Sequence, residues 1–302
     1  MKIIDAHVHL VQCIAGTGAG GELRSCGEGR GMYADGSVCR LLPPGWGDQA
    51  TPERILQTMD DNGVERAVLL QGGYLGFQNL YSWQAQQKWP GRFLAAGAYD
   101  PYSRGRDGIV RHLFEELGMR VVKFEVSTGS GLMATHPVFG LDGEVMEREA
   151  AFADEHGLVF VIDIGKLGSP SSQIGALRRL IRRHAGMKFV VCHLLAPKHS
   201  EMEEMTAGLE ALAGPNVWFD LASLQHNVRP DAPPYPVTRR FIARAVETVG
   251  AGRLLFGTDA PQNLCQFRYG DLVATIAEDP ALAPEQKERI LRQNALEVFW
   301  GG

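Results

Sequence analysis

The sequence lacks a long apolar run, an excess of positive charge and a regular cysteine framework, and each absence excludes a class of protein. No apolar stretch approaches the roughly 18 residues that a membrane-spanning helix needs. The formal net charge of −5 gives no basic surface for nucleic acid or an anionic membrane. Five cysteines, an odd number, fit free thiols in a reducing compartment. With no secretory signal before the first apolar run, we expect a cytoplasmic protein that binds neither membrane nor nucleic acid.

What the sequence does contain is a repeated alternation of short apolar runs and amphipathic stretches, which is typical of parallel βα units. The apolar runs are rich in Val, Ile, Leu and Phe, as expected of parallel strands that are covered on both faces. They occupy residues 3–7, 66–71, 93–99, 121–126, 159–164, 188–193, 217–221 and 254–258.

The stretches between these runs have the signals of helices. Thr51-Pro52-Glu53 supplies an N-cap residue, a proline at the first helical position and an early carboxylate, and Asn62-Gly63 ends the same helix. Further helices are predicted at residues 109–117, 144–156, 174–184, 201–212 and 239–249. Eight strands alternating with helices favour a (β/α)₈ TIM barrel in which residues 1–302 form a single domain.

Residues 11–50 depart from this repeat. They are rich in glycine, contain Pro43-Pro44-Gly45-Trp46 and show no convincing periodicity. Cys13, Cys26 and Cys39 lie thirteen residues apart, a spacing that matches no common zinc site. A loop that follows the first strand of a barrel emerges at the face where active sites lie. We therefore predict an active-site loop insertion that acts as a lid or pocket wall, the alternative being a flexible insertion without a role.

The first strand ends in the sequence Asp5-Ala6-His7-Val8-His9. Alternate side chains of a strand share a face, so His7 and His9 are expected to project together into the mouth of the barrel. Two imidazoles held in this way form half of a chelating site for a metal such as zinc.

Further polar residues occupy the ends of other predicted strands. They are His193 on the sixth, Asp259 on the eighth, Asp163 on the fifth, and Lys123 with Glu125 on the fourth. A carboxylate in an apolar run, such as that of Asp163, requires a cation or hydrogen bonds. Lys123 and Glu125 share a face, and they either pair with each other or contact a substrate. A purely structural hydrogen-bonded set is the alternative for the histidines and Asp259, but convergence on one barrel mouth favours an active site.

The loop after the seventh strand contains His226, Asn227 and Arg229. Loops at this end of a barrel line the active site, so His226 and Arg229 are candidates for contact with a substrate. A plain polar surface loop is the alternative.

Taken together, the motifs resemble those of the amidohydrolase superfamily, in the amidohydrolase-related branch with the aminocarboxymuconate-semialdehyde decarboxylases and related lactone hydrolases. The segments that carry the resemblance span the chain: Asp5-Ala6-His7-Val8-His9, Cys192-His193-Leu194, Phe219-Asp220-Leu221, Gly257-Thr258-Asp259-Ala260-Pro261 and Asn294-Ala295-Leu296-Glu297-Val298-Phe299. The resemblance implies that His7, His9 and Asp259 bind a divalent metal ion, and that His193 is an acid/base near the substrate carbonyl. It also implies a possible homodimer.

One position departs from the pattern of that branch. A histidine on the fifth strand completes the metal site in the family, and here Asp163 stands at that place. An aspartate also binds zinc or manganese, so two histidines with Asp163 and Asp259 would be a sound ligand set, most consistent with zinc. The alternative is a site without metal, as in the pyrone-dicarboxylate lactonases.

The leading functional hypothesis is metal-dependent hydrolysis of a lactone, ester or amide bond in a small carboxylated molecule. Asp259 would act as the general base, His193 would stabilise the oxyanion, and arginines of residues 11–50 or Arg229 would clamp a substrate carboxylate. Non-oxidative decarboxylation of an aromatic or muconate-type acid is the first alternative. A catalytically degenerate barrel that binds a small molecule is the second.

Overall fold

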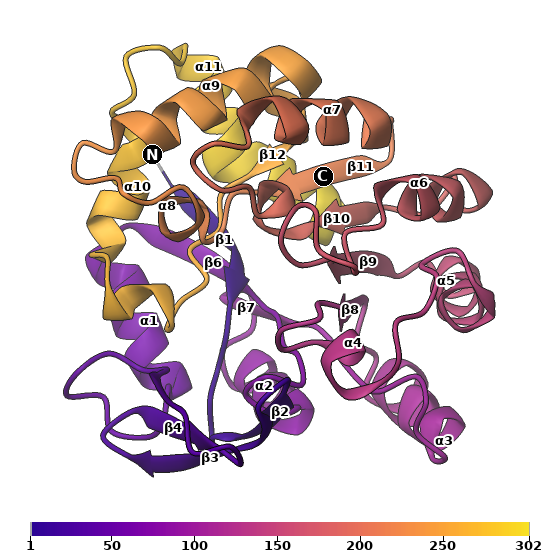
Figure 1. The fold of residues 1–302 in the computed structure, drawn as a ribbon. Coiled ribbons are helices and arrows are strands. Elements are labelled where there is room, and N and C mark those ends of the chain that lie inside the picture. Colours follow the sequence, from indigo (N-terminus) through magenta and orange to yellow (C-terminus); the bar gives the residue numbers. More distant parts are fainter. Residues whose placement is uncertain (1, 302) are drawn as a thin grey trace.

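A computed structural model describes residues 2–301. Its centre is formed by eight parallel strands, with helices arranged around them (Figure 1). The strands are β1 (Ile3–Val8), β6 (Val64–Leu69), β7 (Phe93–Ala95), β8 (Val121–Glu125), β9 (Val159–Asp163), β10 (Phe189–Val191), β11 (Val217–Asp220) and β12 (Leu254–Leu255). Every predicted strand is present, and the α/β class is confirmed.

The eight strands belong to two sheets whose strands follow chain order. One sheet is β1-β6-β7 and the other is β12-β11-β10-β9-β8. Single parallel bridges, Val8 to Ala260 and Gly97 to Val122, link the sheets at their edges. All carboxyl ends of these strands therefore point to one side. Several strands are shorter than predicted, because the chain leaves the ladder before its polar residues: β12 ends at Leu255 and β10 at Val191.

The helices follow the strands as the sequence indicates. The longer ones are α1 (Pro52–Asp61), α2 (Asn79–Lys88), α3 (Arg106–Val110, with a further helical segment Arg111–Glu116), α5 (Glu144–Glu155), α6 (Ile174–Arg183), α7 (Met202–Leu212), α9 (Pro236–Val249) and α10 (Tyr269–Ala277). Short helices α4 (Leu132–Thr135), α8 (Leu224–Asn227) and α11 (Pro284–Glu288) complete the set. Thr51 caps α1 by accepting the Arg54 N–H at 3.3 Å. Within residues 2–301, no helix is long and apolar enough to cross a membrane.

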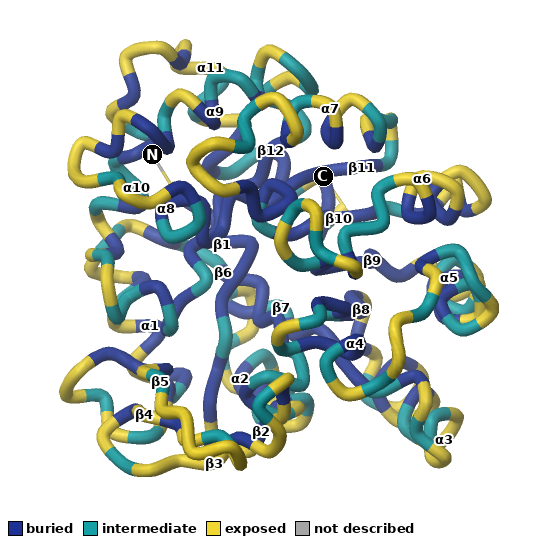
Figure 2. Tube along the Cα trace, in the orientation of Figure 1, coloured by how far each residue is buried: buried dark blue, intermediate teal, exposed yellow. Residues whose placement is uncertain are grey.

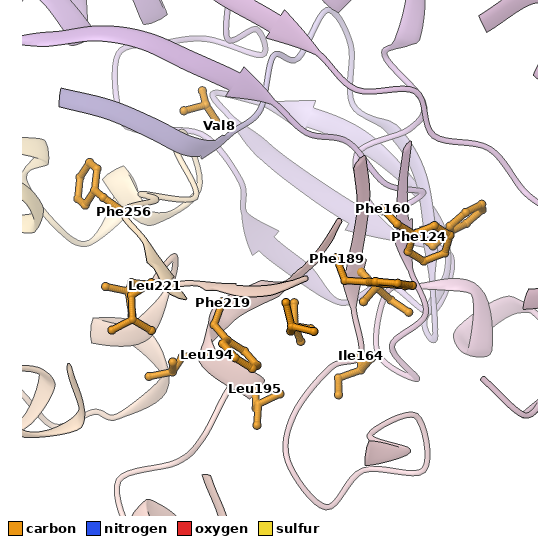
Figure 3. Packing of buried hydrophobic residues seen from close by; sticks show 14 of the residues in the cluster. Val8, Phe124, Phe160, Ile164, Phe189, Leu194, Leu195, Phe219, Leu221 and Phe256 are labelled. Carbon is orange, nitrogen blue, oxygen red and sulfur yellow. The ribbon is translucent and has the colours of Figure 1, made fainter. Parts of the chain in front are cut away.

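Alternate residues of the strands form two apolar layers. Phe160 packs against its neighbours on adjacent strands, Phe124 and Phe189, at ring-centroid distances of 5.4 Å with the rings tilted, on the side that faces the helices (Figure 3). Val159 and Val161, the residues on either side of Phe160, belong to a second cluster with residues of the other strands. This two-residue period is that of strands buried on both faces. The strands are accordingly buried along their length while the outer helices are exposed on one side (Figure 2).

The expected insertion after the first strand is present, but it is not an irregular loop. It forms an antiparallel sheet of β2 (Ala15–Gly18), β3 (Gly21–Gly27), β4 (Arg30–Tyr33) and β5 (Val38–Arg40). The sheet has a small core of its own around Leu23, Leu41 and Leu42. Its strands are short and glycine-rich with mostly exposed side chains, so they lack the apolar alternation by which a strand is recognised in a sequence.

A buried ion-pair network fastens α5 to the segment after β7. Glu149 of α5 is 1% exposed and accepts hydrogen bonds from Tyr99 Oη at 2.6 Å and Arg106 Nη2 at 2.6 Å. Removing the carboxylate leaves the Arg106 guanidinium largely buried without this partner, so Glu149→Ala is expected to lower the free energy of unfolding by about 3–5 kcal/mol. Urea denaturation measures the difference, with exposed Glu155→Ala of the same helix as the control. Equal stability of the two variants would contradict the prediction.

Candidate active site

The carboxyl ends of the strands surround a cavity of about 420 Å³. Every predicted site residue except Arg229 lines it. These residues are His7, His9, Lys123, Glu125, Asp163, His193, His226 and Asp259. The geometry thus brings together side chains that lie as far apart in the sequence as the first strand and the eighth.

His7 and His9 both face this cavity because of an irregularity in β1. The register with β6 shifts between Asp5 and Val8, so that Ala6 packs in the inner apolar cluster and His7 also lines the cavity. His7 is fully buried and its Nδ1 donates to Asp220 Oδ2 at 3.0 Å. The Nδ1 of His9 donates to the carbonyl of Leu70 at 2.8 Å. Each Nδ1 therefore carries the proton in the neutral ring, and each Nε2 offers a lone pair.

Asp259 is the third member of this group. Its Oδ1 lies 3.0 Å from His9 Nε2 and 3.8 Å from His7 Nε2. Its Oδ2 accepts a hydrogen bond from the Ser223 hydroxyl, and its backbone N–H donates to the carbonyl of His7 at 2.9 Å. Asp259 and Ser223 both have positive φ, 58° and 59°. Strained backbone of this kind is stabilised only by its surroundings and is frequent at functional sites.

His7, His9 and Asp259 fit a divalent metal ion. Their three ligand atoms lie within 4.8 Å of one another. Two imidazole nitrogens and one carboxylate oxygen are the donors that zinc prefers. Burial lowers the pKa of His7 to about 4, so this ring is neutral at neutral pH and able to bind a metal. With Nδ1 protonated, His9 Nε2 and Asp259 Oδ1 are two acceptors facing each other at 3.0 Å, an arrangement that a cation between them would stabilise.

Asp163 faces His193 and is not a member of that three-residue group. Its Oδ2 lies 3.4 Å from His193 Nε2, and its Oδ1 accepts the Gly165 N–H at 2.8 Å. The other ring nitrogen of His193 donates to the carbonyl of Ala222 at 3.0 Å. Burial alone would lower the pKa of His193, but the carboxylate of Asp163 outweighs it and raises that pKa to about 10. The cavity therefore holds an imidazolium beside the candidate metal ligands.

His193 lies in an unusual backbone segment. It begins a run of four non-glycine residues with positive φ, His193 to Ala196, at 60°, 49°, 68° and 48°. A left-handed conformation costs roughly 1–2 kcal/mol per residue. The run is held at its start by Asp220, whose Oδ1 accepts the His193 N–H at 2.8 Å. Because no glycine or asparagine marks this segment, the sequence predicted a straight strand as far as His193.

Asp220 belongs to one of the motifs that carry the family resemblance, but the sequence predicted no role for it. It is fully buried at the end of β11. One oxygen accepts from the backbone of His193 and, at 3.1 Å, from that of Ala222, and the other accepts from His7. Burial would raise the pKa of Asp220, but His7 and His193 outweigh it and hold the carboxyl below its ordinary value. A buried carboxylate in an apolar strand, the signal used for Asp163, also marks this position.

The family model described as amidohydrolase matches residues 4–300. The chain belongs to the amidohydrolase family. It is therefore an enzyme, and enzymes of this family generally depend on a bound metal ion. Among curated proteins, no sequence matches this amidohydrolase.

Solved structures show the same fold at low sequence identity. A probable 2-pyrone-4,6-dicarboxylic acid hydrolase from Acinetobacter baumannii, with citric acid bound, is 14% identical, with 99% of this chain and 100% of that chain covered and a TM-score of 0.70. An amidohydrolase from Burkholderia multivorans with bound zinc is 15% identical, with 99% of each chain covered and a TM-score of 0.72. A 2,6-dihydroxybenzoate decarboxylase from Rhizobium is 15% identical, with 82% of this chain and 88% of that chain covered and a TM-score of 0.56. These neighbours share the fold of this chain, and the family model confirms the amidohydrolase family that the motifs indicated.

Lys123 and Glu125 of this amidohydrolase do not form the mutual ion pair that was one of two expectations. Lys123 is 3% exposed, and its Nζ lies 3.5 Å from His7 Nε2. Glu125 instead accepts hydrogen bonds from the hydroxyls of Ser127 at 3.2 Å and Ser130 at 2.6 Å. Burial lowers the pKa of Lys123, but Cys192 and the nearby carboxyl groups of Glu125 and Asp163 outweigh it and leave that pKa raised. The cavity therefore contains a second buried cation.

The two remaining candidates differ in their placement. His226 lines the cavity of the amidohydrolase, whereas Arg229 does not. Arg229 donates to Gln266 Oε1 at 2.8 Å and to the carbonyl of His226 at 2.7 Å. It therefore supports the short helix α8, which carries His226. Of the insertion, Tyr33 on β4 lines this cavity and Arg40 lines an adjoining one.

Proposed function

We propose that this amidohydrolase is a metal-dependent hydrolase that cleaves a lactone, ester or amide bond in a small carboxylated molecule. The observation that carries the proposal is the group of His7, His9 and Asp259, whose ligand atoms lie within 4.8 Å of one another in the cavity that His193 also lines. A zinc or manganese ion held by these three residues would lower the pKa of a bound water molecule and polarise the substrate carbonyl.

The side chains around this group have separate tasks in the proposed reaction. Asp259, whose carboxylate faces His9 and accepts the hydroxyl of Ser223, takes the proton of the attacking water and passes it to the leaving group. His193 donates a hydrogen bond to the carbonyl oxygen as negative charge develops there. Lys123, a buried side chain whose Nζ lies 3.5 Å from His7 Nε2, holds the carboxylate of the substrate.

Decarboxylation of an aromatic or muconate-type acid is the second candidate. His193 and Lys123 favour it, since Lys123 would orient the acid and a protonated His193 would supply the proton that replaces the carboxylate lost as carbon dioxide. The fold that this chain shares with a 2,6-dihydroxybenzoate decarboxylase is compatible with it.

Metal analysis and product analysis together test the proposal. The purified protein is expected to contain about one equivalent of zinc or manganese and to hydrolyse members of a panel of carboxylated lactones, esters and amides, giving products whose combined mass exceeds that of the substrate by one water. Release of carbon dioxide from aromatic acids would select the second candidate. Absence of turnover from both panels by the metal-loaded protein would contradict both candidates.

Asp163 is the fourth ligand predicted from the sequence, whereas its contact in the structure is with His193. We expect Asp163→Asn to retain the metal and to lower kcat at least tenfold, because the asparagine still accepts the Gly165 N–H but no longer holds a charged His193. Metal content and kcat are measured on the same preparation. Loss of the metal in this variant would instead support the four-ligand set.

A further inference from the structure

A second cavity, of about 260 Å³, adjoins the first. The two share five lining residues, which are Gly72, Gly76, Lys123, Glu125 and Ser130. Lys123 and Glu125 belong to β8, so the junction lies at the carboxyl end of this strand. A ligand bound at Lys123 is therefore adjacent to both cavities.

The wall of the second cavity is mainly apolar. Phe77, Tyr99, Phe124 and Leu132 line it, and Phe77 is 45% exposed. The lining contains two carboxyl groups, and both have partners: Asp100 binds His136 Nε2 at 2.7 Å, and Glu125 accepts the Ser130 hydroxyl at 2.6 Å. An apolar recess lined by aromatic side chains is the usual environment for the apolar part of a small ligand.

Lys123 has hydrogen-bonding capacity to spare at the junction. An ammonium group has three donors, and the contact made by Lys123 is with His7 Nε2 at 3.5 Å. Among residues 2–301 it forms no salt bridge, although it is almost fully buried. A buried cation without a carboxylate partner is stabilised when an anionic ligand binds it.

We propose that the second cavity binds an apolar arm of the substrate, an alkyl or aryl group whose carboxyl end is held at Lys123. The proposal rests on the proposed function for the identity of the reacting group. It assigns the substrate class more narrowly: a carboxylated molecule with an apolar extension, rather than a compact polar acid.

Binding of simple carboxylates tests this without requiring turnover. Calorimetric titration of the metal-loaded protein with acetate, butanoate and hexanoate is expected to show an affinity that rises about fourfold per methylene. Equal affinities of the wild-type protein for acetate, butanoate and hexanoate would overturn the proposal.

Two substitutions locate the arm. A Cβ at Gly73 would meet only Thr17 Oγ1, at 3.7 Å, so Gly73→Val adds bulk to the cavity without a backbone clash. Phe77→Ala removes an apolar wall at an exposed position. Both are expected to reduce the dependence on chain length while leaving the affinity for acetate near that of the wild type. Leu80→Ala is the matched control, since Leu80 is 52% exposed on α2 and does not line the cavity. A chain-length dependence unchanged in both cavity variants would place the arm elsewhere.

The outcomes for the two proposals are distinguishable. If no lactone, ester or amide is hydrolysed but affinity rises with chain length and falls in Gly73→Val, the proposed function fails and the arm-binding cavity stands. If hydrolysis is observed without any dependence on chain length, the cavity proposal fails and the function stands.

Discussion

Asp220→Asn is expected to weaken metal binding about 10- to 100-fold while the protein remains folded. In the wild type, one oxygen of Asp220 accepts two backbone N–H groups and the other accepts from His7 Nδ1. An asparagine keeps its oxygen toward the two N–H groups and presents its amide NH₂ to His7. Nδ1 must then accept, so the ring proton moves to Nε2 and removes the lone pair that binds metal.

The measurement is the dissociation constant for zinc, obtained by competition with a chelator, with circular dichroism as the check on folding. Asp279→Asn is the matched control, because Asp279 is also buried but does not line the cavity. Nitrogen NMR of His7 reports the tautomer directly. Wild-type zinc affinity in the Asp220 variant would show that this carboxylate does not set the tautomer.

Asp259→Asn is expected to have the largest effect on turnover, a fall in kcat of about 10²- to 10⁴-fold, because an amide cannot accept the proton of the attacking water. The amide oxygen can still accept from the Ser223 hydroxyl while the amide NH₂ donates to His9 Nε2, so the position of the side chain is preserved. Kinetics on a hydrolysed substrate at saturating metal separate this effect from weaker metal binding.

Asp271→Asn on α10 is the control for the same chemical change outside the cavity. A variant at position 259 with wild-type kcat would exclude Asp259 as the general base. A rise in KM with unchanged kcat would assign it to substrate binding instead.

The sequence was sufficient for the parts of this protein that depend on local pattern. Continuous apolar runs predicted all eight strands, and polar residues at strand ends predicted the lining of the cavity, because the carboxyl ends of parallel strands meet on one side. The His-x-His spacing predicted that His7 and His9 lie together, and the structure places their ring centroids 5.0 Å apart.

The parts that were missed depend on contacts between distant residues. The bond from His7 to Asp220 joins residues 213 positions apart, and no local pattern specifies it. The left-handed run from His193 to Ala196 contains no glycine or asparagine, so the sequence carries no sign of it. The direction of Arg229 depends on Gln266, which follows the next strand.

The small antiparallel sheet of β2 to β5 is separate from the strands that carry the proposed chemistry, so the sequences of the two parts can change independently. The proposed chemistry belongs to the ends of β1, β10 and β12, whereas Tyr33 reaches the cavity from a sheet with its own apolar core. Substitutions on that sheet alter the wall that a substrate meets without disturbing the metal ligands or the strands behind them. Homologues with the same ligand residues are therefore expected to differ most in this segment, and exchanging it between them is a direct route to altered substrate preference.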